Sequence, residues 1–157
     1  YQFHAIDPNV PLEESLGEIA KLQKEGKIRH VGVSNFDVAE LERARKIVPV
    51  VSVQNRYNVS DRSSDPVLAV CERDGLVFIP WSPLSQSPRD SNAGSRAALE
   101  AWALERKVSL PQAAIAWLLA RSPAMLPIPG TSKAKHLEEN VAAAALRVPP
   151  EEMRAIG

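Results

Sequence analysis

The sequence predicts an α/β fold built on a parallel sheet, because short apolar segments alternate with amphipathic segments along the whole chain. The apolar segments are rich in β-branched residues, as strands are, and cover residues 1–6, 29–33, 50–53, 76–80 and 124–128. The segments between them have apolar residues at helical spacing, which predicts helices at 12–23, 38–48, 65–74, 95–106, 110–121 and 133–144, with a last helical turn at 150–156. Parallel neighbouring strands need such crossover helices.

The first strand, residues 1–6 (YQFHAI), reads as a buried strand that begins without a methionine or a leading segment. We therefore expect the chain to be part of a longer protein. The helix that follows has Leu12, Leu16 and Ile19 on one face, and Gly26 is a typical residue to end it.

The later elements have local signals of their own. Asp37 followed by Glu40 predicts a capping box for helix 38–48, and Ser109 predicts an N-cap for helix 110–121. Helix 65–74 contains Cys71, the single cysteine, which has no partner for a disulfide within the chain. We therefore expect a cytoplasmic protein.

Two architectures satisfy this pattern. A closed β/α barrel has eight strands in typically ~250 residues, whereas the 157 residues here predict about five strands. The sheet is therefore either an open, doubly wound one or an incomplete barrel.

Length and composition restrict the partners. The chain is 45% hydrophobic and 24% charged, as in an ordinary globular protein, and we expect a single domain over residues 1–157. Its 19 Lys and Arg residues balance 19 Asp and Glu residues, so no net charge would attract a polyanion. The apolar runs fall short of the roughly 20 residues that cross a bilayer. We expect a small-molecule ligand, and neither nucleic acid nor a membrane as partner.

Polar residues mark the ends of the predicted strands, where parallel α/β proteins bind ligands. They are His4 within the first strand, and then Ser34-Asn35, Gln54-Asn55, Trp81-Ser82 and Gly130-Thr131-Ser132. Each has a plain alternative: Ser34 and Asn35 could begin a helix, Gln54 and His4 could be hydrogen-bonded core residues, and Trp81 could serve packing alone. Convergence at one edge of a sheet favours a polar ligand, because buried amides need partners.

The last strand end predicts an anion site. Gly130, Thr131 and Ser132 precede a helix that carries Lys133, Lys135 and His136, so free backbone N–H groups and cations meet there. A nucleotide phosphate would suit this site, and the alternative is a glycine turn before a helix with exposed lysines. The sequence has neither G-x-G-x-x-G nor G-x-x-x-x-G-K-[ST], so a bound dinucleotide would not be held in the Rossmann manner.

Four segments resemble, in order and spacing, the C-terminal part of the aldo-keto reductases. They are GVSNF (32–36), SVQNRYN (52–58), PWSPL (80–84) and PIPGTSKAKHLEEN (127–140). The last is the most diagnostic, and it is closer to the bacterial and potassium-channel β-subunit branches than to mammalian aldose reductase. The resemblance implies a parallel (β/α)8 TIM barrel that is incomplete here, with about strands 4 to 8 and their helices. It also implies NADPH (NADP+) as cofactor, hydride transfer that reduces aldehydes and ketones to alcohols, a small carbonyl compound as substrate, and no metal ion.

The resemblance also assigns roles to the residues at the strand ends. His4 matches the histidine that orients the substrate carbonyl. Ser34, Asn35 and Gln54 match residues that hold the nicotinamide carboxamide, and Trp81 matches the aromatic residue that stacks on the ring. A longer set matches the rest of the cofactor: Ser82, Pro83, Leu84 and Ser85 on the pyrophosphate path, and Gly130, Thr131, Ser132, His136, Glu139 and Asn140 at the adenosine and 2′-phosphate end.

Three departures from the family limit the expected activity. The family's catalytic Tyr, Asp and Lys precede the histidine strand and are absent from this sequence, and Tyr1 and Tyr57 are not at the matching place. His136 stands where many members have arginine, and imidazole lacks the guanidinium fork. Segment 85–94 is short where several members have a loop over the cofactor. We therefore expect the chain alone to be inactive, because carbonyl reduction needs a proton donor.

Two further interpretations stay open at this point. The chain could be a non-catalytic nucleotide-binding or regulatory module. It could also be a structural fragment that misfolds alone, with open sheet edges at residues 1–6 and 124–128 through which copies self-associate.

Overall fold

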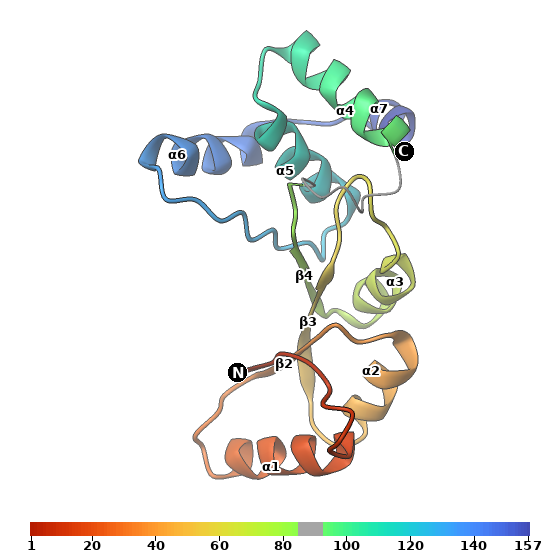
Figure 1. The fold of residues 1–157 in the computed structure, drawn as a ribbon, viewed down its shortest axis with the longest axis vertical. Coiled ribbons are helices and arrows are strands. Elements are labelled where there is room, and N and C mark those ends of the chain that lie inside the picture. Colours follow the sequence, from red (N-terminus) through yellow and green to blue (C-terminus); the bar gives the residue numbers. More distant parts are fainter. Residues whose placement is uncertain (85–92) are drawn as a thin grey trace. The chain divides into compact units, whose positions relative to one another are not determined.

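The computed structural model describes residues 1–84 and 93–157, which divide into two compact units (Figure 1). The first unit comprises Tyr1–Asn55 and Ser64–Ile79, and the second comprises Arg56–Ser63 and Pro80–Gly157. Among the described residues, no helix is both long enough and apolar enough to cross a membrane.

The first unit confirms the alternation of strands and helices. Its helices connect consecutive strands and are α1 (Leu12–Lys24), α2 (Val38–Arg45) and α3 (Asp65–Asp74). The sheet has the order β1-β2-β3-β4, with strands β1 (Gln2–Phe3), β2 (Val31–Ser34), β3 (Val50–Arg56) and β4 (Val77–Trp81), and the last residues of β3 and β4 belong to the second unit. The pairs β1–β2 and β2–β3 are parallel, as predicted.

Several local signals place these elements. The predicted capping box begins α2: Glu40 N donates to Asp37 Oδ1 at 2.7 Å, and Asp37 N donates to Glu40 Oε2 at 2.8 Å. Helix α3 has the predicted bounds because it begins with a proline in its first turn and ends at Gly75, whose φ is +69°. In β2, a Cβ on Gly32 would lie 2.2 Å from Gln2 Oε1 and 2.3 Å from Ser52 Oγ, so any larger residue would require these side chains of the two neighbouring strands to move.

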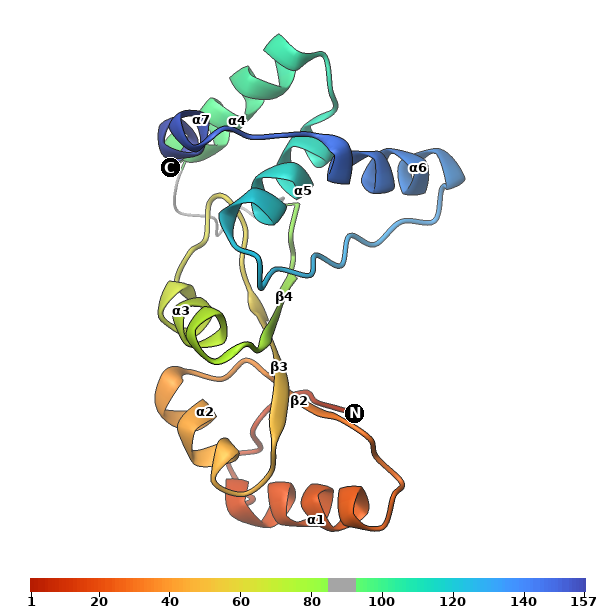
Figure 2. The same cartoon turned by 180° about the vertical axis from the view of Figure 1, so that it is seen from behind.

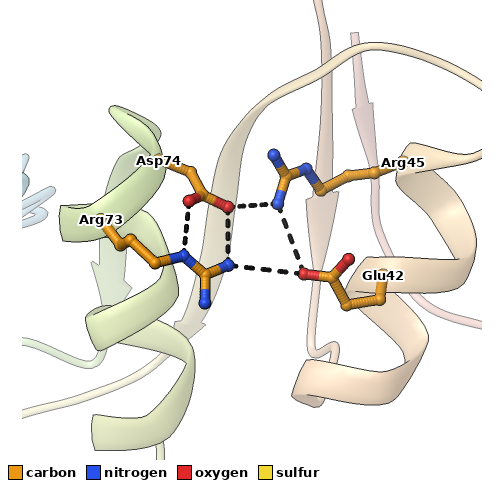
Figure 3. Close-up of polar contacts among 4 residues, drawn as sticks. All are labelled: Glu42, Arg45, Arg73 and Asp74. Atoms are coloured by element: carbon orange, nitrogen blue, oxygen red, sulfur yellow. Dashed lines mark hydrogen bonds and ion pairs between the residues drawn. The ribbon is translucent and has the colours of Figure 1, made fainter.

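An ionic cluster joins α2 and α3 (Figure 3). Arg73 and Arg45 both reach the carboxylate of Asp74, and both also contact Glu42. The Arg73 Nε lies 2.6 Å from Asp74 Oδ1. Hydrogen bonds from Arg73 and then from Arg45 hold the pKa of Asp74 well below its ordinary value. The cluster therefore ties two helices of the first unit by charge, beside a core that contains Leu41, Leu68 and the buried Cys71.

The second unit is mainly helical and is organised around one buried helix. Its elements are α4 (Ala93–Arg106), α5 (Leu110–Arg121), α6 (Ala134–Ala142), the 3-10 turn η1 (Ala143–Ala145) and α7 (Pro150–Ile156). Helix α5 contacts the other four (Figure 2). It begins with the predicted cap at Ser109, whose hydroxyl accepts from Gln112 N. Trp117 of α5 is fully buried and stacks on Tyr57, with ring centroids 6.2 Å apart.

Two predicted strands are corrected by the structure. Residues 1–6 contain only the short β1, and Tyr1 is 69% exposed, because within the described residues β1 pairs with β2 alone. Residues 124–128 form no strand beyond an isolated bridge at Met125. Pro127 and Pro129 explain this, since proline has no N–H to donate to a sheet. The expected sheet edge for self-association at 124–128 is therefore absent.

Smaller corrections concern element ends. Helix α2 ends at Arg45 rather than at residue 48, shortly before Pro49, because the residue before a proline disfavours helical backbone. Helix α6 gives way to η1 after Ala142, within the helix predicted at 133–144. Strand β3 is longer than predicted and includes Gln54 and Asn55, which therefore lie within the strand.

Candidate functional site

In the first unit, four predicted site residues lie together at the carboxyl end of the sheet. These residues, His4, Ser34, Asn35 and Gln54, are called here the strand-end cluster. Ser34 is almost fully buried, and its hydroxyl donates to the backbone oxygen of Gln54 at 2.6 Å. The Asn35 amide donates to the backbone oxygen of His4 at 3.1 Å, and the Asn35 N–H donates to the Gln54 oxygen at 3.0 Å. Backbone and side-chain hydrogen bonds thus link β2 to both of its neighbours.

The geometry of the strand-end cluster decides two alternatives raised by the sequence. Ser34 and Asn35 do not cap the next helix, because Asp37 is the N-cap of α2. His4 is not a core residue, because its side chain is exposed. Asn35 has a φ of +61°, a left-handed conformation that costs free energy in a residue other than glycine and is concentrated at functional sites.

Asn55 supports this cluster and was not given a role from the sequence. Its side chain is 5% exposed, accepts from Phe36 N at 3.1 Å and donates to the Phe36 oxygen at 2.7 Å. It therefore fixes the segment that follows Asn35. No sequence motif marks this role. It can be recognised only once the contact between the Asn55 amide and the backbone of Phe36 is known.

In the second unit, Trp81 ends β4 and is half-buried. The guanidinium carbon of Arg56 lies over its ring, 5.5 Å from the centroid. The next residue, Ser82, has a φ of +54°, and its backbone oxygen accepts from the amide of Asn58 at 3.1 Å. Pro83 and Leu84 continue in a turn, and the predicted site residue Ser85 lies outside the described residues.

A second group of predicted residues lines one cavity of about 340 Å³ in the second unit, called here the helix-start pocket. Its lining joins the end of the β4 segment to the start of α5 and the start of α6. The lining residues are Leu84, Ser109, Pro111, Gly130, Thr131, His136, Glu139 and Asn140. The structure thus brings together six residues that the sequence predicted as cofactor-binding. Ser132, also predicted, is exposed beside the pocket and does not line it.

Two lining residues were missed by the search of strand ends. Ser109 and Pro111 belong to the start of α5, which follows another helix and not a strand. Sequence reasoning gave Ser109 only its capping role. A rule that inspects helix starts as well as strand ends would have found both.

The helix-start pocket is open and electrostatically suited to an anion. Helix α6 begins at Ala134 without a side-chain cap, so its first N–H groups remain available. Thr131 Oγ1 accepts from Lys133 N at 3.1 Å, which fixes the turn before the helix. A Cβ on Gly130 would meet nothing within 4 Å, which shows free space at that corner of the pocket. Phosphate and nucleoside oxygens could use these N–H groups, the Thr131 hydroxyl and the polar side chains of Glu139 and Asn140.

The sequence and the fold of this chain match known proteins over most or all of its own residues. The family model of the aldo/keto reductase family matches residues 1–157. An uncharacterized oxidoreductase of Schizosaccharomyces pombe is 46% identical over 151 residues, which is 96% of this chain and 48% of that protein. Pyridoxine 4-dehydrogenase of Escherichia coli is 39% identical over 141 residues, covering 89% of this chain and 48% of that enzyme.

A solved structure gives the same result for the fold. An aldo-keto reductase from Klebsiella pneumoniae, solved in complex with NADPH, is 27% identical and superposes with a TM-score of 0.85 over 99% of this chain and 56% of that chain. The chain thus spans about half the length of the proteins it matches. Its fold is accordingly part of their parallel β/α barrel, which settles the choice between an open sheet and an incomplete barrel.

Proposed function

This chain belongs to the aldo/keto reductase family, and we propose that it forms the nucleotide-binding part of an NADPH-dependent oxidoreductase that reduces aldehydes or ketones to alcohols. On this proposal, residues 1–157 are a single partial barrel domain. Bound NADPH would supply the hydride, and the residues of this chain would bind and orient it. The cytoplasm remains the proposed compartment, which the unpaired Cys71 favours.

The observation that carries the proposal is the helix-start pocket. Six residues that the resemblance assigns to the cofactor line one cavity, although Leu84 is 46 or more positions from the other five in the sequence. The uncapped start of α6 offers N–H groups to phosphate, and Glu139 and Asn140 offer hydrogen bonds to a nucleoside. These residues fit the adenosine and phosphate end of NADPH.

In the first unit, the proposal assigns the strand-end cluster to the nicotinamide carboxamide and the substrate. In the second unit, it assigns Trp81 to stacking on the nicotinamide ring. Ser34, Asn35 and Gln54 would hold the carboxamide, which decides which face of the ring is presented. The Ser34 and Asn35 hydrogen bonds support this role, because they hold the side chains before a ligand arrives. His4 would orient the substrate carbonyl, and its exposed side chain is compatible with that role.

A specific observation favours binding without turnover by these 157 residues. Carbonyl reduction by hydride transfer needs a proton donor beside the reacting oxygen. Of the two tyrosines, Tyr57 is fully buried against Trp117, and Tyr1 is at the start of the chain, far exposed. Neither stands at the place that the resemblance gives to the family's catalytic tyrosine. We propose that the chain alone acts as a nucleotide-binding module.

The proposal is tested by titrating NADPH into the 157-residue chain while tryptophan fluorescence is recorded. The key variant is Gly130→Phe, because Gly130 has free space around it and no positive φ, so a phenyl ring enters the pocket without backbone strain. We expect saturable quenching by NADPH in the wild type and its loss in Gly130→Phe. Gly17→Phe is the matched control, since Gly17 of α1 also has free space around it.

The outcomes are distinct. If wild type shows no quenching up to millimolar NADPH, or if Gly130→Phe binds as tightly as wild type, the proposed site is wrong. A parallel assay with NADPH and a simple aldehyde should show no turnover. Turnover at ordinary enzyme rates would reject the statement that the proton donor is missing from these residues.

A further inference from the structure

Arg56 and Trp81 form a stacked pair in the second unit that the proposed function does not yet use. The guanidinium carbon of Arg56 lies 5.5 Å from the centroid of the Trp81 ring, within the range of a cation–π interaction. The Arg56 side chain is 21% exposed, so its charge is only partly screened by water. One face of the indole is therefore covered by a cation.

The loop that follows Arg56, up to residue 63, holds this cation in place through hydrogen bonds and an ion pair. Arg56 Nε lies 2.9 Å from Asp61 Oδ2, and the other carboxylate oxygen of Asp61 accepts from the hydroxyl of Ser63 at 2.7 Å. Asn58 is fully buried, and its amide oxygen accepts from the N–H groups of Ser60 and Asp61, both at 2.9 Å. The same Asn58 amide donates to the oxygen of Ser82, next to Trp81. The loop thus positions the arginine and the tryptophan together.

This geometry has a consequence for a ring stacked on Trp81. Because Arg56 covers one face of the indole, a nicotinamide ring that stacks on Trp81 as proposed would lie on the other face. The oxidised nicotinamide of NADP+ carries a positive charge, whereas the dihydronicotinamide of NADPH is neutral. A fixed cation on the far side of the indole repels the oxidised ring only, and it also draws on the same π electrons that would attract it.

We propose that Arg56 is a specificity-determining residue that makes the site prefer the reduced cofactor over the oxidised one. This inference rests on the proposed function, namely on stacking of nicotinamide on Trp81. Asp61 moderates the effect, because its carboxylate offsets part of the arginine charge. Preference for NADPH favours loading of the reduced cofactor and the release of NADP+ after hydride transfer.

The size of the effect follows from the charge and its distance. The cation and the ring would lie on the order of 9 Å apart across the indole, where one uncompensated charge changes an equilibrium by about 10-fold or more at the effective dielectric of a protein. With Asp61 partly compensating, we expect Arg56 to change the ratio of the two dissociation constants by about threefold to tenfold.

The test measures the Kd of NADP+ and of NADPH for wild type and three variants of the chain by fluorescence titration. Arg56→Gln removes the charge and should lower the ratio Kd(NADP+)/Kd(NADPH) by about threefold to tenfold, mainly through tighter NADP+ binding. Arg56→Lys keeps the charge and should retain most of the ratio. Asp61→Asn removes the compensating charge and should raise the ratio, the opposite direction.

These outcomes separate the inference from its premise. If wild type binds neither nucleotide, the proposed function fails, and this inference fails with it. If wild type binds but Arg56→Gln weakens both nucleotides equally, Arg56 has a structural role only and the inference alone is overturned. Thermal unfolding by circular dichroism identifies a variant that does not fold. If Arg56→Gln does not fold, the rise in the ratio expected for Asp61→Asn decides the matter, and an unchanged or lower ratio in that variant overturns the inference.

Discussion

The strand-end cluster and the helix-start pocket are built in opposite ways. In the cluster, Ser34 is buried and bonded to the backbone of the neighbouring strand, and Asn35 is held in a left-handed conformation. At the pocket, the segment 130–138 that contributes to its lining is exposed, and within the described residues Ser132 and His136 make no side-chain hydrogen bond. The side chains of the strand-end cluster are held by hydrogen bonds within the protein, whereas the helix-start pocket presents exposed groups that a ligand could contact.

This difference indicates that the two regions have different roles in binding the cofactor. The orientation of a nicotinamide ring needs side chains whose positions are fixed in advance, because small misplacements change the reacting geometry. The binding of a phosphate needs accessible N–H groups and can be provided by an exposed helix start. Substitutions in the cluster should therefore change stability, whereas substitutions at the pocket should change affinity alone.

The largest expected effect is the loss of the buried amide that supports the cluster. Asn55→Ala leaves the N–H and the oxygen of Phe36 without partners, and it should lower the free energy of unfolding by about 2–4 kcal/mol. Urea denaturation measures this. The control is Asn9→Ala, whose exposed amide donates to Asp7, with an expected change within about 0.5 kcal/mol. Equal effects for the two variants would contradict the statement that the buried Asn55 amide supports the cluster.

The same substitution made in each region compares them directly. Ser34→Ala removes a buried 2.6 Å hydrogen bond and should cost about 1–2 kcal/mol of unfolding free energy. Ser132→Ala changes an exposed residue beside α6 and should cost less than about 0.5 kcal/mol. Urea denaturation of both variants is the measurement. A loss of unfolding free energy for Ser132→Ala as large as that for Ser34→Ala would show that the segment beside the pocket is also held by hydrogen bonds within the protein.

His136 tests the affinity side of the comparison. His136→Arg places a guanidinium fork in the pocket and should tighten NADPH binding by about threefold to tenfold, without changing NADH binding. Stability should not change. His30→Arg, a substitution of another exposed histidine, is the control. An equal gain for NADH would mean that the arginine does not contact the 2′-phosphate.

The smallest expected effect concerns the ionic cluster of the first unit. The arginines lower the pKa of Asp74, so its carboxylate stabilises the folded state above the unfolded pKa of about 3.9 and loses this contribution as pH falls toward the lower, folded pKa. Asp74→Asn should therefore be less stable than wild type at pH 7, and the gap should shrink below about pH 4. Urea denaturation at pH 7 and at pH 3 checks the sign. A gap that widens at pH 3 would contradict it.

The sequence predicted most elements because their signals are local. The capping boxes at Asp37 and Ser109, and the proline start and glycine end of α3, placed these helices with the right start or bounds. The strand at 124–128 was predicted from apolar character alone, although its prolines argue against pairing. The short β1 could not be foreseen, because a strand's length depends on its neighbours.

The candidate site was predictable to a similar degree. The rule of strand ends found every residue of the strand-end cluster and, with the resemblance, most of the helix-start pocket. It listed Asn55 but gave it no role, because that role depends on its pairing with Phe36. It did not find Arg56, whose stacking on Trp81 depends on the turn made by Asn58. Contacts between segments distant in sequence leave no local pattern.

Hydrogen–deuterium exchange with and without saturating NADPH tests the central claim most directly, namely that the exposed start of α6 is the phosphate-binding end of the site. We predict that amides of residues 130–140 exchange more slowly with NADPH present, whereas those of α2 do not change. In Gly130→Phe this protection should be lost. Protection of α2 without protection of 130–140, or no change anywhere at saturating NADPH, would contradict the account.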